Sequence, residues 1–324
     1  MASVKITKEG VEFITHVCNV GMVNKNGNTM LAGKNSYPLP FCFQPQANQI
    51  WVCDIKIPNT SIKMTSGNDL AQGLILWFNK YAQMYDLDAN VIAAQAYAES
   101  GYKMWNYAGG NSTASGVNQF LSSTVYEVIV KNDGKSYNPT NYFTPEEVNK
   151  IINGLTQGRI EASYKPGGNT DAPSPAHQVA WNNRPTLHQN IINNPEIMIK
   201  AQCLYMSWIS NRCNTLASST LFGYSRGPGY SLKTYTDSIQ ECAMQNTQEY
   251  LQEGLNYVLK IFGVLGDKNN FLGSKGLGSY YKPVGKYFGY NESKGNDPKN
   301  LRLTQNFDSF NANVAQSNIK HPTA

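Results

Sequence analysis

The spacing of apolar residues predicts two consecutive helices in the first half of the chain. Between residues 68 and 85, apolar side chains recur at three- and four-residue intervals, as they do on one face of a helix. A second helix is expected directly afterwards, with Asp88 as its N-cap and Gly101 as the left-handed residue that ends it. Glu99 therefore falls in the last turn of this second helix.

Two later segments carry the signals of a helix start. Thr144 as N-cap, followed by Pro145 at the first helical position, predicts a short helix. Asn194 followed by Pro195 predicts a longer helix, which continues with an apolar stripe at helical spacing. A further helical region is expected over residues 231–265.

The beginning of the chain lacks this helical period. Short runs at residues 4–6, 11–20 and 50–57 are rich in β-branched and aromatic residues, and turn-forming residues separate them. We therefore expect short strands in a β-rich N-terminal flank.

The pattern as a whole predicts three consecutive parts and a mainly α (α+β) fold class. The N-terminal flank covers residues 1–66, and the central helical domain covers residues 67–265. The central domain carries an insertion at about residues 126–190, in which short helical pieces alternate with Gly- and Pro-rich connections. Residues 266–324 are rich in Gly, Asn, Ser and Tyr without a clear period, which predicts an irregular C-terminal arm.

Composition excludes several classes of protein. Of the 324 residues, 41% are apolar and 15% are charged, while asparagine alone supplies 37, which is too apolar and too uncharged for intrinsic disorder. No run approaches the roughly 20 apolar residues of a membrane span, and the start MASVKITKEG lacks the apolar core of a secretory signal. We expect neither a membrane span nor Sec-dependent export.

The net charge of +5 is spread along the chain without a block of like charges, so no nucleic-acid partner is expected. This mild basicity suits an anionic polymer such as cell-wall glycan, and it equally suits a slightly basic soluble surface. The six cysteines include no CxxC pair and the four histidines are dispersed, so we expect free thiols, no metal site, no cofactor and no histidine-based triad.

The segment AYAESGY, residues 96–102, is the first candidate for chemistry. A carboxylate at a helix C-terminus faces the negative end of the macrodipole, and aromatic neighbours such as Tyr97, Tyr102 and Trp105 would add desolvation. Both effects raise the pKa of Glu99, and a protonated glutamic acid can donate its proton to a glycosidic oxygen. An ordinary exposed glutamate in a last helical turn would fit the same residues.

Three further segments follow Glu99 in order. They are SGVNQF at 115–120, the helix at 194–208, and FGYSRGPGY at 222–230, which would place Tyr224 in a glycine-rich turn. Glycine lets the backbone approach a ligand closely, and tyrosine offers a flat apolar face with a hydroxyl, a combination that suits sugar rings. Each segment alone also fits an ordinary loop or core helix, so their order is the stronger evidence.

With these segments in place, the chain resembles the soluble lytic transglycosylase family of the lysozyme-like superfamily over about residues 70–262. The family has a catalytic Glu-Ser at a helix end, a Gly-Leu-Met-Gln loop, an Asn/Asp-Pro-Glu helix and an Ala-Tyr-Asn-Ala-Gly-Pro-Gly turn. The similar residues here are Glu99-Ser100, Gly116-Val117-Asn118-Gln119, Asn194-Pro195-Glu196 and Gly223-Tyr224-Ser225-Arg226-Gly227-Pro228-Gly229. The chain departs from the family at Asn118, Ser225 and Arg226, where the family has Met, Asn and Ala.

The resemblance implies cleavage of the bond between N-acetylmuramic acid and N-acetylglucosamine, with Glu99 as acid and then as base, and a 1,6-anhydro product. It implies glycan contacts by Ser100, Tyr102, Ser115, Gly116, Gln119, Tyr224 and Gly227. No Asp or Glu lies between Glu99 and Glu127, whereas goose-type lysozymes carry aspartates there, so we expect the single-acid route. A distant carboxylate such as Glu161 or Asp171 could still restore hydrolysis.

An enzyme of this kind without an export signal must reach the wall by another route. The leading hypothesis is a bacteriophage tail or baseplate lysin, located in the virion, bound to neighbouring virion proteins and acting in the host cell wall or periplasm. A secretion-apparatus enzyme or an endolysin has less need of the additional N- and C-terminal segments. A structural virion protein that binds glycan without cleaving it is the alternative from another class.

Overall fold

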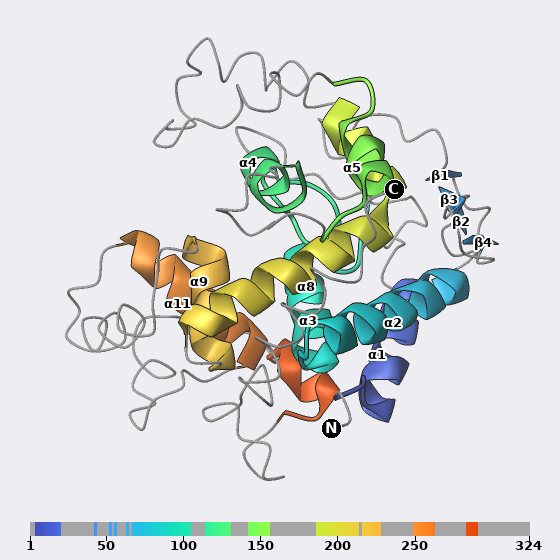
Figure 1. Ribbon diagram of the computed structural model, residues 1–324. Coiled ribbons are helices and arrows are strands. Elements are labelled where there is room, and N and C mark those ends of the chain that lie inside the picture. The colour runs from blue at the N-terminus through green and yellow to red at the C-terminus, as the bar shows by residue number, and fades with distance from the viewer. Residues whose placement is uncertain are drawn as a thin grey trace. The chain divides into compact units, whose positions relative to one another are not determined.

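The structure is a computed structural model, and the residues that it describes are 4–20, 42–43, 52–53, 55–56, 63–64, 67–104, 114–130, 142–155, 186–213, 216–227, 249–262 and 283–290. Most of these residues are helical (Figure 1), so the expected mainly α fold class is confirmed at this level. None of the helices in these stretches is both long enough and apolar enough to cross a membrane.

The regular elements are as follows. The α-helices are α1 (Lys8–Val20), α2 (Gly67–Met84), α3 (Ala89–Ser100), α4 (Ser122–Val125), α5 (Pro145–Ile152), α8 (Pro195–Arg212), α9 (Ala217–Arg226) and α11 (Glu249–Phe262). A π-helix, η1 (Tyr126–Val130), and a 3-10 helix, η3 (Val284–Phe288), accompany them, and residues 186–193 are also helical. The strands are β1 (Cys42–Phe43), β2 (Val52–Cys53), β3 (Ile55–Lys56) and β4 (Lys63–Met64), which form the antiparallel pairs β1–β2 and β3–β4.

The four helices predicted from caps and apolar stripes are confirmed as α2, α3, α5 and α8. The Thr144 hydroxyl accepts a hydrogen bond from the Glu147 backbone N–H at 3.1 Å, and the Glu147 carboxylate accepts one from the Thr144 N–H at 2.9 Å. This reciprocal capping box explains why α5 begins at Pro145. Of the helical region predicted over 231–265, α11 is described, while residues 228–248 lie outside the described residues.

The strand predicted over residues 11–20 is wrong, because α1 runs through this segment. Gly10, Ile14 and Cys18 are all buried and recur every four residues, so they form one buried face of a helix. This four-residue period favours a helix more strongly than the β-branched residues of the segment favour a strand. Residues 4–6 are not strand either. Of the segment 50–57, the described residues form β2 and β3, and residues 50, 51, 54 and 57 lie outside the described residues.

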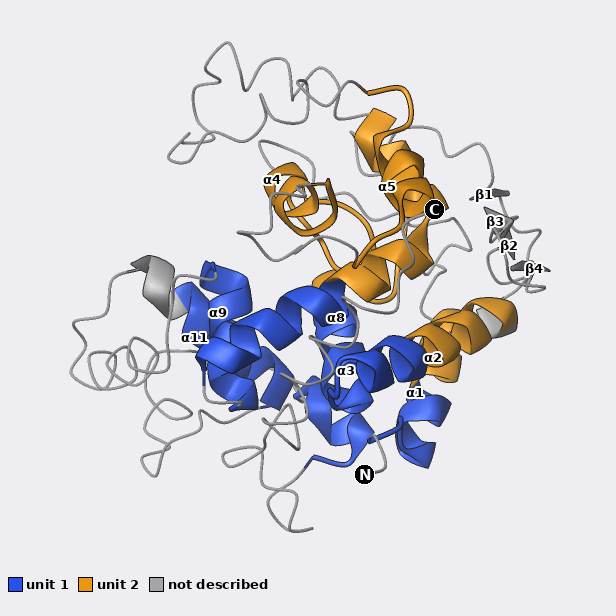
Figure 2. Cartoon of the chain, in the orientation of Figure 1, with its two compact units in different colours: residues 1–13, 78–98, 202–314 blue, residues 14–77, 99–201, 315–324 orange. Residues whose placement is uncertain are grey.

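The chain divides into two compact units, which Figure 2 shows in different colours. Unit 1 comprises residues 1–13, 78–98 and 202–314, and unit 2 comprises residues 14–77, 99–201 and 315–324. Four helices contribute residues to both units, namely α1, α2, α3 and α8. The organisation into three consecutive domains stays a prediction.

A buried carboxylate, Asp88, fixes the start of α3 in unit 1. Its Oδ1 accepts hydrogen bonds from the Asn90 backbone N–H at 2.9 Å and from the Asn90 side chain at 3.0 Å, which confirms the predicted N-cap. Its Oδ2 accepts one from the Tyr290 hydroxyl at 2.6 Å. Burial raises the pKa of Asp88, although these hydrogen bonds act in the opposite direction.

Asparagine side chains attach the N-terminal segment to the same region of unit 1. The Asn90 amide accepts a hydrogen bond from the Thr7 N–H at 2.9 Å and donates one to the Lys5 carbonyl at 3.0 Å. The Asn79 side chain accepts one from the Ile6 N–H at 2.9 Å. Residues 5–7 therefore lie against α2 and α3 without forming a strand.

Residues 283–290 belong to the stretch predicted as an irregular arm, yet they pack in unit 1. Val284, Phe288 and Tyr290 are buried, and the ring of Tyr290 meets that of Phe262 edge to face at 5.8 Å. A Cβ on Gly285 would lie 2.9 Å from the Ile261 carbonyl oxygen, so the two backbones approach closely. The rest of the predicted arm lies outside the described residues.

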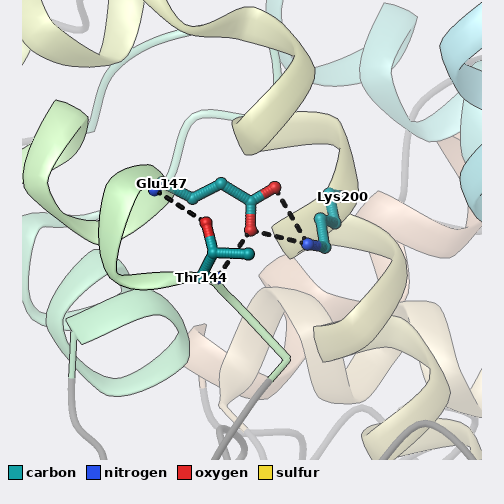
Figure 3. A network of polar contacts seen from close by, with 3 residues as sticks. All are labelled: Thr144, Glu147 and Lys200. Carbon is teal, nitrogen blue, oxygen red and sulfur yellow. Dashed lines mark hydrogen bonds and ion pairs between the residues drawn. The ribbon is translucent and has the colours of Figure 1, made fainter. Parts of the chain in front are cut away.

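An ion pair between the buried Lys200 and the partly exposed Glu147 joins α5 to α8 in unit 2 (Figure 3). The Lys200 ammonium lies 2.9 and 2.8 Å from the two carboxylate oxygens of Glu147, and the Lys200 side chain is only 5% exposed. The same ammonium lies 4.8 Å from the centre of the Phe143 ring. Glu147 thus both caps α5 and neutralises a buried cation, which anchors part of the predicted insertion to α8.

We expect Asp88→Asn to remove part of the pH dependence of stability. Because burial raises the folded pKa above the unfolded value of roughly 3.9, the folded state binds more protons, and stability falls as the pH rises from that value through the folded pKa. Denaturant unfolding between about pH 4 and pH 8 should therefore show a smaller fall in the variant than in the wild type. Asp86→Asn is the control, and equal falls in the wild type and Asp88→Asn would contradict the expectation.

We expect Glu147→Gln to lower the free energy of unfolding by about 3 kcal/mol, because it leaves the buried Lys200 ammonium without its partner. The matched control is Glu146→Gln, which removes an ion pair between the largely exposed Glu146 and Lys150 of the same helix and should change stability little. Urea denaturation measures both variants. Equal losses would show that burial does not distinguish the two pairs.

Candidate functional site

Glu99 is the next-to-last residue of α3 and is partly exposed. The helix ends after Ser100 because Gly101 adopts the left-handed conformation, with φ of 62°. A Cβ at Gly101 would meet nothing within 4 Å, so the glycine serves the backbone conformation rather than packing. The predicted position of Glu99, at the end of a helix closed by glycine, is confirmed.

The Lys260 ammonium on α11 donates a hydrogen bond to the carbonyl of Ala98, within unit 1. This carbonyl is one of the last four of α3, which have no partner inside the helix. A cation at this end offsets the negative end of the macrodipole. The helix dipole therefore acts less strongly on groups at this end of α3 than the sequence alone predicts.

Ser100 fastens the end of α3 to a loop of unit 2. The Ser100 hydroxyl is buried and donates a hydrogen bond to the Val117 carbonyl at 2.8 Å. Loop and helix end are therefore held side by side, although 17 residues separate them in the chain. This bond accounts for the serine that follows the acid, and the hydroxyl is engaged with the protein rather than exposed for a sugar.

The loop itself, residues 114–120, is an ordered turn. Its ends meet where the Ser115 N–H donates to the Phe120 carbonyl at 3.2 Å, and the Gln119 side chain donates to the Gly116 carbonyl at 2.8 Å. Asn118 is fully buried and donates to the Met198 carbonyl of α8 at 2.8 Å. At the position where the family has methionine, this chain thus has an amide that fixes the loop to α8.

Position 116 requires a glycine for two reasons, its backbone conformation and the lack of space for a side chain. Its φ is 79°, and a Cβ there would lie 2.6 Å from a side-chain carbon of Ile191. Gln119, with φ of 50°, also adopts the left-handed region, which is uncommon for a residue with a side chain. These two residues give the turn its shape.

Burial separates the predicted glycan contacts of unit 2 into two groups. Ser100, Tyr102, Ser115 and Gly116 are buried, and the Tyr102 ring has no exposed surface with which to stack on a sugar. Gln119 is partly exposed, as is Glu99. The first group supports the local structure, and the second is accessible to a ligand.

Lys103 is a partly exposed charged residue near Glu99 that the sequence analysis missed. Its backbone N–H donates to the Ser100 carbonyl at 3.2 Å, which closes the turn after α3, and burial lowers the pKa of its side chain. No ion pair joins it to a carboxylate in the part of the chain that the structure describes. The signal was available in the sequence, since no Asp or Glu follows Lys103 until Glu127.

Tyr224 lies in the last turn of α9 and not in a glycine-rich turn, which corrects the expectation for residues 222–226. Its ring packs edge to face on Tyr205 at 5.4 Å and parallel to Tyr257 at 6.4 Å, within unit 1. Gly227 ends the helix with φ of 111°, and its N–H donates to the Gly223 carbonyl at 2.8 Å. The grouping of Tyr224 and Gly227 with Glu99 stays a prediction.

Several candidate residues lie outside the described residues, namely Trp105, Glu161, Asp171, Pro228 and Gly229. Within the described ranges, no group of three or more His, Cys, Asp or Glu side chains could hold a metal ion. Cys18, Cys203 and Cys213 are free and buried, as predicted for these thiols.

Comparison of the chain with protein-family models, with curated proteins and with solved structures finds no match. The site is therefore interpreted from its own residues.

Gly116→Ala should lower the free energy of unfolding by about 2–5 kcal/mol, because it combines a left-handed backbone with a clash against Ile191. Gly101→Ala is the matched control, since it has a similar φ but open space, and it should cost about 1–2 kcal/mol. Thermal and urea denaturation provide the comparison.

The Ile191→Ala background tests whether the clash is the cause. There, Gly116→Ala should cost less than it does in the wild type. An unchanged cost would assign the whole effect to the backbone conformation.

Proposed function

We propose that the protein cleaves the glycan strands of peptidoglycan, with Glu99 as the proton donor. The observation that carries this proposal is a partly exposed carboxylate at the end of α3, beside a loop that the buried bond from Ser100 to Val117 holds in place. A group held by packed supporting residues is suited to general acid catalysis, because proton transfer depends on fixed geometry. The motif order described in the sequence adds to this support.

In the proposed reaction, Glu99 donates its proton to the glycosidic oxygen as the bond from C1 of N-acetylmuramic acid breaks. The N-acetyl group of the same sugar stabilises the positive centre at C1. Glu99, now a carboxylate, takes the proton of the C6 hydroxyl while that oxygen bonds to C1. The products are a 1,6-anhydro sugar and a new chain end, and Glu99 recovers its proton, so neither water nor a cofactor is consumed.

The single-acid route is preferred to hydrolysis because of the carboxylates around Glu99. A hydrolytic muramidase places a second carboxylate about 5 Å from the acid, or about 6.5–9.5 Å away when that carboxylate activates water. Glu127, the next acidic residue along the chain, is buried in η1 and is a poor candidate for holding an exposed water. A goose-type lysozyme-like hydrolase is the alternative, with Glu161 or Asp171 as the second group.

The proposed fold is that of a lysozyme-like transglycosylase domain, and the proposed setting is a phage virion. A tail or baseplate lysin would open the host wall locally, and its partners would be peptidoglycan and neighbouring virion proteins. The C-terminal arm and the N-terminal flank would provide attachment, through residues other than the packed segments 4–13 and 283–290. Electron microscopy of the source particle, with an antibody against this protein, tests the setting.

We expect Glu99→Gln to reduce the release of soluble fragments from purified peptidoglycan at least about 100-fold, because the amide has no proton to donate to the leaving oxygen. Glu12→Gln, an exposed site on α1, is the matched control and should keep wild-type activity. Mass spectrometry of the fragments identifies the route, since anhydro products are one water lighter than hydrolysed ones.

Three outcomes distinguish the hypotheses. Anhydro products from the wild type and none from Glu99→Gln support the proposed reaction. Hydrolysed products support the muramidase. Binding of peptidoglycan without cleavage by the wild type supports the structural virion protein and overturns the enzymatic proposal.

A further inference from the structure

We infer that Lys103 binds a carboxylate of the peptide stem on the substrate, and so makes cleavage depend on stem-bearing glycan. The inference rests on the proposed function and adds a specificity determinant to the same site. It is drawn from three features of unit 2, which are the place of Lys103 in the chain, its lack of a carboxylate partner, and the chemistry of the polymer.

The end of α3 determines where Lys103 lies. Glu99 and Lys103 are four residues apart, a spacing that forms ion pairs inside a helix. Here Gly101 and Tyr102 both adopt the left-handed conformation, with φ of 62° and 63°, so the chain turns away before residue 103. The fully buried Tyr102 ring and the backbone bond from Lys103 to Ser100 hold this turn. Lys103 therefore follows Glu99 by only four residues, but the turn takes it off the helix face that carries Glu99.

Among the described residues, no carboxylate forms an ion pair with Lys103, whereas two other lysines of unit 2 have such a partner. Lys150 pairs with Glu146 at 2.7 Å and Lys200 with Glu147 at 2.8 Å. Lys103 is half-buried, and desolvation of a charge is unfavourable unless a partner compensates it. A ligand carboxylate would provide that compensation.

The substrate offers such a group in a suitable place. The sugar rings of peptidoglycan carry no fixed charge where the lactyl group of N-acetylmuramic acid is joined to a peptide, and the negative charges lie on that peptide. The lactyl group is attached to C3 of the sugar whose C1 bond would be broken. A cation in the turn that follows the general acid is therefore suited to meet the stem.

The test compares Lys103→Met with the wild type on two substrates: stem-bearing glycan strands, and the same strands with their stem carboxylates amidated. We expect Lys103→Met to lower kcat/KM about tenfold on the first substrate and to leave kcat/KM on the second unchanged. Lys103→Arg, which keeps the charge, should retain most of the activity on the first substrate. A similar loss on both substrates, or no loss on the first, overturns the inference.

A binding assay keeps the inference separate from the proposed reaction. Co-sedimentation with insoluble peptidoglycan, in the Glu99→Gln background, should show several-fold weaker binding for Lys103→Met than for Lys103→Arg. Amidating the stem carboxylates should abolish this difference. If the wild type cleaves nothing while this difference persists, the proposed reaction fails and the stem contact stands. Equal binding by the two variants removes the stem contact, whatever the enzyme does.

Discussion

Buried amides and hydroxyls must find hydrogen-bond partners, and this constraint holds distant segments of the chain together. Asn90 ties residues 5 and 7 to the start of α3, Asn118 ties the 114–120 loop to α8, and Ser100 ties the end of α3 to that loop. Each bond joins a side chain to the backbone of a segment remote in sequence. A chain with only 15% charged residues thus uses uncharged polar side chains where other proteins use ion pairs. The ion pair of Glu147 and Lys200 is the charged counterpart of these ties.

The same constraint gives the candidate site its organisation. The turn and the loop depend on Ser100, Tyr102 and Gly116, because the side chains or backbones of these residues pack against neighbouring residues. The charged and polar groups left with exposed surface are Glu99 at the end of α3, Lys103 in the turn after it, and Gln119 in the loop. Supporting residues and accessible residues are thus neighbours in sequence but have different roles. This division makes a proton donor with a fixed position physically reasonable.

The errors of the sequence analysis have identifiable physical causes. The strand expected over residues 11–20 follows from β-branched composition, whereas the four-residue period of Gly10, Ile14 and Cys18 decides for helix. The turn expected around Tyr224 follows from its glycine-rich neighbourhood, yet α9 continues through Gly223 and ends only at Gly227. Residues 283–290 are too few to show a period, and the segment buries Val284, Phe288 and Tyr290 in unit 1.

Local signals in the sequence were sufficient to determine α2, α3, α5 and α8, since caps, prolines and apolar stripes act within a few residues. They also placed Glu99 at a helix end and identified Gly101 as the residue that ends it. Tertiary structure alone decided which of the predicted contact residues are buried, because burial depends on remote segments such as Ile191 and Met198. The tertiary structure also decided that, among the described residues, no carboxylate forms an ion pair with Lys103. Pairing of charges is a property of three-dimensional neighbours, which spacing along the chain does not specify.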